Sequence, residues 1–199
     1  MSQVFLENHN APKLSGQSPH IHNKVSETNF NMTKQPSSIQ LFITGGTIDK
    51  QYQTTTGELV FLETHIPQLL KEANCTLPVQ VDVLMQKDSL EMTSHDRELI
   101  MGACLKSPAQ QIVITHGTDT MVETASRLSK SPALENKTIV LTGAMRPFML
   151  GYSDASFNIG CALMAAQLSE AGIYVVMNGQ LFCADQVQKN RKKGLFTPL

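Results

Sequence analysis

The feature that most constrains this chain is a pair of apolar runs that each end in glycine followed by threonine. The segment 41–49 reads LFITGGTID, and the segment 114–121 reads ITHGTDTM. β-Branched residues favour a strand, and glycine permits backbone angles and a close ligand approach that a Cβ would block. Parallel α/β sheets bind ligands beyond the carboxyl ends of their strands, where free N–H groups of a helix start suit an anion. The pattern predicts that Thr47 and Thr118 face one crevice for a small anionic ligand.

Strand-like and helix-like stretches alternate from Ile39 onward, which is typical of a parallel sheet with crossover helices. We therefore expect an α/β fold with three layers, α/β/α, around a mostly parallel sheet. The expected strands are 39–44, 79–85, 111–115, 137–142 and 173–178, and the expected helices lie near 65–73, 94–106, 119–130 and 154–170.

Several local signals refine this prediction. Two expected helices carry an apolar stripe at helical spacing, which predicts a face packed on the sheet. The stripes are Met121, Ala125 and Leu128 in one helix and Phe157, Cys161, Ala165 and Leu168 in the other. Thr93 with Asp96 predicts a capping box before the helix at 94–106. Ser153 or Asp154 is the expected cap of the helix that carries Phe157.

The polar segment 49–61 directly follows the first Gly-Thr motif. It contains Tyr52, three successive threonines and Gly57. We expect it to form a loop that closes over the ligand.

The length of 199 residues fits one domain with a substantial core. Residues 1–37 are rich in Asn, Ser, Gln, Pro, Lys and His without a sustained apolar period, which predicts a disordered tail before a domain at 38–199. Met32 is a second candidate for the translation start, because the recognisable domain begins only at Ser38 or Ile39.

Composition and charge argue against several kinds of partner and bear on the expected cellular location. A net charge of −1 gives no general attraction to nucleic acid or to an anionic membrane. No apolar run approaches the roughly 18 residues of a membrane span, and the N-terminus lacks a signal-peptide pattern. The four cysteines are widely spaced without a CxxC pair, so we expect reduced, mostly buried thiols, no metal site and no organic cofactor in a cytoplasmic protein.

A threonine hydroxyl needs a base to become a nucleophile at neutral pH. Three lysines that follow the last expected strand are candidates for this base: Lys189, Lys192 and Lys193. A neutral lysine amine beside Thr118 and Asp119 could accept the proton. The sequence does not favour any one of the three lysines. His116 is a second candidate base, although a histidine on a buried strand is more often structural. Each Gly-Thr motif also has a simpler interpretation, as a glycine turn with an N-cap threonine.

The chain resembles the bacterial-type L-asparaginase and glutaminase family, specifically its N-terminal domain. TGGTI at 44–48 is similar to the first signature of that family, and THGTDTM at 115–121 with ETA at 123–125 is similar to the second. TGAMRP at 142–147, SDA at 153–155 and Phe157-Asn158 extend the resemblance, which covers about residues 39–189. It implies a Rossmann-like or flavodoxin-like sheet and hydrolysis of a side-chain amide to a carboxylic acid and ammonia.

The resemblance also implies catalytic roles. Thr47 corresponds to the nucleophile, and Thr118, Asp119 and Lys189 correspond to a second Thr-Asp-Lys cluster. Tyr52 is the expected lid tyrosine, although the usual family spacing after Thr47 reaches a position near Val60.

The substrate-binding residues implied by the same resemblance are Gly46, Ser89, Gly117 and Asp119. Ser89 and the Gly117 backbone would receive the α-carboxylate of the substrate, and Asp119 would pair with its α-ammonium. Backbone N–H groups and Thr118 would form the oxyanion pocket.

Family members usually carry a second domain that completes the site of a neighbouring subunit, and we expect this domain to be absent here. Two hypotheses follow. The chain is a single-domain asparaginase-like amidohydrolase, or it is a binding or sensor module that keeps the amino-acid pocket without efficient turnover. Either protein is expected to form a homodimer or larger homo-oligomer, because an uncovered apolar face marks an interface.

Overall fold

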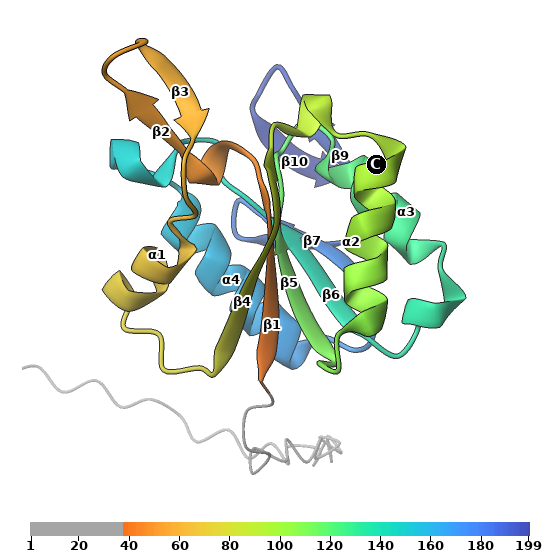
Figure 1. Ribbon diagram of the computed structural model, residues 1–199. Coiled ribbons are helices and arrows are strands. Elements are labelled where there is room, and N and C mark those ends of the chain that lie inside the picture. Colours follow the sequence, from red (N-terminus) through yellow and green to blue (C-terminus); the bar gives the residue numbers. More distant parts are fainter. Residues whose placement is uncertain (1–37) are drawn as a thin grey trace, which may run out of the picture. The chain divides into compact units, whose positions relative to one another are not determined.

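A computed structural model describes residues 38–199, and the predicted disordered tail at 1–37 lies outside the described residues (Figure 1). The main sheet has six strands in the order β4-β1-β5-β6-β7-β8. Five of them run parallel and β8 is antiparallel to β7. The mostly parallel sheet expected from the sequence is confirmed. Its strands are β1 (Ile39–Gly45), β4 (Val79–Lys87), β5 (Gln111–Thr115), β6 (Thr138–Thr142), β7 (Gly172–Met177) and β8 (Gln180–Cys183).

The order of the parallel strands is the flavodoxin-like one, in which the first strand lies between the second and the third. The direction of the chain's progress across the sheet therefore reverses between β1 and β5. Folds of this kind bind their ligands at that switch point, outside the carboxyl ends of the two strands. Thr47 follows β1 and Thr118 follows β5, so both motifs lie at this point.

Four α-helices cover the sheet in two layers (Figure 1). The helices are α1 (Ile66–Glu72), α2 (Ser94–Lys106), α3 (Met121–Ser129) and α4 (Ala155–Leu168). Strand residues alternate between the faces, as the pleat requires. Phe42, Ile112 and Ile114 pack in one core cluster with α2 and α3. Leu41, Ile43 and Val113 pack in the other with α1 and α4. The predicted three-layer α/β/α architecture is confirmed.

Short elements complete the described part of the chain. Two antiparallel hairpins are formed by β2 (Lys50–Gln53) with β3 (Glu58–Phe61), and by β9 (Val187–Asn190) with β10 (Leu195–Pro198). Single 3₁₀ turns are η1 (Thr47–Asp49), η2 (Ser89–Glu91), η3 (Pro132–Leu134) and η4 (Phe148–Leu150).

The expected capping box of α2 is present. The Thr93 hydroxyl accepts the Asp96 N–H, and the Asp96 carboxylate accepts the Thr93 N–H. The start of α4 is different. Asp154 occupies its N-cap position without capping it, because the carboxylate accepts the N–H groups of Met145 and Arg146 instead. The Ala155 N–H donates to the Ser153 hydroxyl.

One predicted helix face is wrong. Met121, Ala125 and Leu128 of α3 are buried as expected. In α4, however, Phe157 and Leu168 are 59% and 58% exposed, and Cys161 and Ala165 are only partly buried against the core. The sheet is covered mainly by the face with Ile159, Ala162, Leu163 and Ala166. Both faces of α4 are apolar, so periodicity alone could not distinguish them.

Two further expectations need correction. The segment 49–61, expected as a loop, contains the β2–β3 hairpin; its closure over a ligand stays a prediction. Only Cys104 of the four free cysteines is buried, and burial raises the pKa of its thiol to about 12. Within residues 38–199, no helix has the length and apolarity needed to cross a membrane.

Candidate active site

The ends of β1 and β5 approach each other so closely that only glycine fits between them. A Cβ on Gly46 would lie 2.4 Å from the Gly117 nitrogen, and Gly46 has φ of +83°, which L side chains rarely adopt. The Thr44 hydroxyl donates to the Thr115 carbonyl at 2.7 Å and joins the same two strands. Thr47 and Thr118 each lie one residue beyond this glycine contact. The predicted convergence of the two motifs is therefore seen in the structure.

Thr118, Asp119 and Lys189 form one cluster. The Lys189 side-chain nitrogen lies 2.7 Å from Thr118 Oγ1 and 2.9 Å from Asp119 Oδ1. The Lys189 side chain is 9% exposed and that of Asp119 is 36% exposed. The other Asp119 carboxylate oxygen has no partner among the described residues and is available to a ligand. Thr47 is half-buried, and no described residue hydrogen-bonds its hydroxyl.

The β9–β10 hairpin brings Lys189 to the cluster. Lys189 pairs with Phe196 across the hairpin, and the Phe196 side chain is buried in the core. The Phe196 N–H donates to the Asn178 side chain, and the Asn178 N–H donates to the buried Asn158 side chain. These contacts anchor the hairpin to α4 and to the end of β7. Lys192 and Lys193 lie in the exposed turn of the hairpin, so the structure distinguishes Lys189 from them.

Ser89 lies against the same glycine motif, as expected. It is 1% exposed, and a Cβ on Gly117 would lie 2.6 Å from its hydroxyl oxygen. The Thr120 hydroxyl donates to the Ser89 carbonyl at 2.8 Å, and the Thr120 N–H reaches the Ser89 hydroxyl at 3.4 Å. The serine hydroxyl thus accepts from the protein and keeps its own proton for another acceptor.

Charged pairs near Ser89 were not predicted. Lys50 binds Asp88 at 2.5 Å, and this contact with Lys50 is the main reason that the pKa of the Asp88 carboxyl lies below its usual value. The positive charge of Lys189 lowers it further. Lys87 binds the buried Asp96 at 2.7 Å and lowers the pKa of that carboxyl strongly. Both pairs join residues of different elements, so the sequence contained no local signal for them.

Asp49 is a second group that the sequence analysis missed. It is fully buried two residues after Thr47 and accepts the Thr64 hydroxyl and the His65 N–H, both at 3.0 Å. Because residues 49 and 64 flank the β2–β3 hairpin, this carboxylate closes the base of the hairpin. Burial raises the pKa of the Asp49 carboxyl.

Tyr52 does not join the cluster in this structure. It lies on β2 with 54% of its surface exposed, and its hydroxyl faces Gly57 near the turn of the hairpin. A lid role for Tyr52 remains a prediction.

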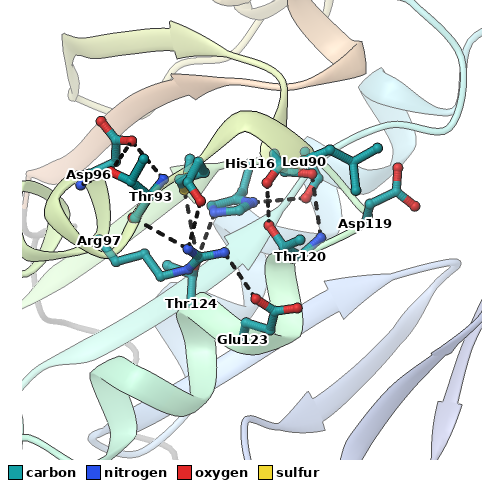
Figure 2. Close-up of polar contacts among 12 residues, drawn as sticks. Leu90, Thr93, Asp96, Arg97, His116, Asp119, Thr120, Glu123 and Thr124 are labelled. Carbon is teal, nitrogen blue, oxygen red and sulfur yellow. Dashed lines mark hydrogen bonds and ion pairs between the residues drawn. The ribbon is translucent and has the colours of Figure 1, made fainter.

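His116 has the structural role that was the alternative to a general base. It is fully buried, with its two ring nitrogens 2.8 Å from the Gly117 carbonyl and from the Thr124 hydroxyl (Figure 2). Burial lowers its pKa to about 4, so the ring is neutral near pH 7. Asp119 points away from this network in Figure 2. Among residues 38–199, no group of three or more His, Cys, Asp or Glu side chains is placed to hold a metal ion.

Comparisons with known proteins identify relatives of this chain. One subunit of the glutamyl-tRNA(Gln) amidotransferase of Methanococcus vannielii is 35% identical over 160 residues, which cover 76% of this chain and 37% of that protein. The glutaminase-asparaginase of Acinetobacter glutaminasificans is 31% identical over 169 residues, covering 77% of this chain and 50% of that protein. The chain thus spans half or less of the length of these relatives.

A solved structure shows the same fold. The thermostable L-asparaginase from Thermococcus kodakarensis superimposes with a TM-score of 0.71 at 29% identity, covering 81% of this chain and 51% of that one. The family model described as "Asparaginase, N-terminal" matches residues 38–197. The chain therefore belongs to the asparaginase family, to which it is matched through the N-terminal domain.

Proposed function

We propose that this protein is an amidohydrolase that cleaves the side-chain amide of L-asparagine or of a related small amide. The observation that carries the proposal is the Lys189 side-chain nitrogen 2.7 Å from Thr118 Oγ1 and 2.9 Å from Asp119 Oδ1, beside the strand end that bears Thr47. A nucleophile, a second hydroxyl and an amine at one switch point suit acyl transfer. The named asparaginase and glutaminase-asparaginase relatives support the same reaction class.

The proposed reaction has two steps. Thr47 Oγ1 attacks the amide carbon, its proton passes to the leaving nitrogen, and the C–N bond breaks to release ammonia and leave a threonine ester. Water then hydrolyses the ester to a carboxylic acid and restores the Thr47 hydroxyl. Lys189, in its neutral form, and Thr118 carry the proton between these groups, because an amine can accept a proton only when it is neutral.

The substrate's own charges fit the surrounding groups. The unpaired oxygen of Asp119 receives the α-ammonium group. The Ser89 hydroxyl and the backbone at Gly117 receive the α-carboxylate, and Gly46 leaves the space for it. We propose that the protein acts in the cytoplasm, as the name of the probable cytoplasmic L-asparaginase from Campylobacter jejuni suggests for that relative.

Replacement of Lys189 by Met tests the proposal. Ammonia release from L-asparagine, L-glutamine and a panel of small amides is expected from the wild type, and K189M should reduce it by about 10³-fold, within the range of general acid–base contributions. K192M, in the exposed turn of the same hairpin, is the matched control and should retain activity.

Two outcomes contradict the amidohydrolase. Equal activity of K189M and the wild type would remove the proposed role of the cluster. A wild type that releases no ammonia, but whose melting temperature rises with L-aspartate, would instead identify the binding module that the sequence left as the alternative.

We also propose that the protein forms a homodimer through the outer face of α4. Phe157, Met164 and Leu168 are 59%, 52% and 58% exposed on this face, and the helix contains no charged residue. The large residues flank Gly160 and Cys161. An antiparallel second copy would place position 157 opposite 168 and position 161 opposite 164, so that the large Phe157 and Leu168 meet each other and each Met164 meets the smaller Cys161. A face without charge meets its own copy without desolvating an ion.

Met164→Glu is expected to give monomers of 21.9 kDa, because the antiparallel arrangement would bring the two carboxylates into a desolvated interface. Light scattering at tens of micromolar measures the mass. Leu99→Glu is the matched control, since Leu99 is 50% exposed on α2 in the other helix layer, and it should leave the dimer intact. A monomeric wild type would contradict the proposed dimer.

A further inference from the structure

A chain of three hydrogen bonds runs from α2 to the peptide bond that precedes Thr118 (Figure 2). The Arg97 Nε lies 3.1 Å from the Thr124 hydroxyl, and this hydroxyl lies 2.8 Å from His116 Nε2. His116 Nδ1 lies 2.8 Å from the carbonyl oxygen of Gly117. All three contacts are buried. They link two helices and a strand end to the site described above.

The direction of each bond follows from its neighbours. The Gly117 carbonyl can only accept, so the proton of the neutral imidazole is on Nδ1 and Nε2 is an acceptor. The Thr124 hydroxyl must therefore donate its proton to Nε2. Its oxygen then accepts the N–H of Arg97, which can only donate. The three hydrogen bonds therefore have one consistent direction: Arg97 donates to Thr124, Thr124 donates to His116, and His116 donates to Gly117.

The first member of the chain is fixed from several sides. Arg97 is 9% exposed, and its guanidinium also donates to the Met92 carbonyl at 2.9 Å and to Glu123 at 3.1 Å. These partners lie just before α2 and in the first turn of α3. Arg97 is thus held by contacts near the starts of the two helices that approach the switch point, and the Glu123 carboxylate balances its charge.

The last member fixes the orientation of a peptide plane. A trans peptide points its N–H opposite to its C=O. With the Gly117 carbonyl bound to His116, the Thr118 N–H points away from the imidazole. Within the described part of the chain, no acceptor binds this N–H. It is a free donor beside Thr118 Oγ1, where the proposed reaction develops negative charge on the amide oxygen.

We propose that Arg97, Thr124 and His116 are positioning residues that lock the Gly117–Thr118 peptide and so present the Thr118 N–H to the substrate oxygen. This inference rests on the proposed amidohydrolase function. None of the three side chains touches the substrate. They act through the peptide, as the supporting groups of a preorganised donor do.

The first test determines which ring nitrogen of His116 carries the proton. Nitrogen-15 NMR of histidine-labelled wild-type protein at pH 7 should show His116 protonated on Nδ1 and not on Nε2, with assignment by H116N. A proton on Nε2 would overturn the proposal, because the imidazole could then not donate to the Gly117 carbonyl.

The second test separates positioning from stability with a matched pair. Thr124→Val removes the hydroxyl at constant shape and should lower kcat/KM by about 30-fold, somewhat less than the loss of one oxyanion donor. Thr124→Ser restores the hydroxyl and should restore kcat/KM to within a few-fold of wild type. Assays are run well below the melting temperature of each variant, so that a stability loss alone does not change the rate.

Arg127→Gln is the control for a general disturbance of the contact between α2 and α3. Arg127 of α3 pairs with Glu98 of α2 on the exposed side, away from the chain of hydrogen bonds. This variant should leave kcat/KM unchanged. Equal rates for T124V and T124S would overturn the positioning role. An inactive wild type that also fails to bind L-aspartate, but has its His116 proton on Nδ1, would overturn the proposed function while leaving the hydrogen-bond order intact.

Discussion

Thr47→Ala is expected to reduce ammonia release by at least about 10⁴-fold, because loss of a nucleophile removes the covalent route and leaves only binding and electrostatic contributions. The Thr47 hydroxyl has no partner among the described residues, so its removal leaves no buried group unpaired. The variant should therefore fold as the wild type does and still bind L-aspartate. Steady-state ammonia release and calorimetric binding measure the two expectations.

The geometry also allows the roles of the two threonines to be tested directly. Thr118 is the hydroxyl that contacts Lys189, at 2.7 Å, whereas Thr47 is free. If Thr47 is the nucleophile, acid-quenched wild-type protein incubated with substrate should carry the acyl mass on the peptide that contains Thr47. An acyl group on the peptide that contains Thr118 would instead assign the attack to Thr118, and T47A would then be expected to remain active.

Much of the fold could be predicted because the relevant signals are local. The run 111–115 is β-branched and fully apolar except at its ends, and β5 occupies the same residues. The Thr93 and Asp96 pair fixes the start of α2, which spans 94–106 as expected. The Gly-Thr motifs end β1 and β5, and parallel topology alone places both at one edge of the sheet.

Other features depend on contacts between distant residues, which a single sequence does not show. The outer face of α4 is as apolar as the inner one, so the Phe157 stripe gave the wrong buried face. The β2–β3 hairpin is held at its base by Asp49 with Thr64 and His65, across 15 and 16 residues. Polar composition there indicated a loop, but the closing contact is tertiary.

The candidate site also combines residues that a local motif predicts with a residue that only a long-range contact identifies. Thr118 and Asp119 are adjacent in the chain, and their motif alone makes them candidates. Lys189 joins them across 71 and 70 residues, and the residues alone could not rank it above Lys192 and Lys193. Contacts of Phe196 and Asn178 anchor the hairpin that places Lys189 at the cluster, and no local sequence pattern predicts these contacts.

Gly46→Ala is expected to have the largest effect on stability. Gly46 has φ of +83° and ψ of 177°, a region that only glycine adopts readily and that costs a side chain about 1–3 kcal/mol. The new Cβ would also lie 2.4 Å from the Gly117 nitrogen and 2.6 Å from its Cα. Both contacts are with backbone, so the ends of β1 and β5 must separate to relieve them.

Gly151 provides a control that isolates the second effect. Its φ of +67° and ψ of 166° lie in the same region, but a Cβ on it would meet nothing within 4 Å. Gly151→Ala should therefore lose only the conformational part, about 1–3 kcal/mol of unfolding free energy, and keep its activity. Gly46→Ala should lose more, by about 2 kcal/mol or above, the range of overpacked sites. Urea unfolding measures the difference.

Activity should separate the two variants further. Moving the strand ends apart displaces Thr47 from Thr118 and Lys189, and a displacement near 1 Å is enough to lower a rate by about 10²-fold. The folded fraction of G46A should thus release ammonia at least about 10²-fold more slowly than that of G151A. Equal losses of stability and activity in the two variants would show that the Gly46–Gly117 contact does not hold the two halves of the site together.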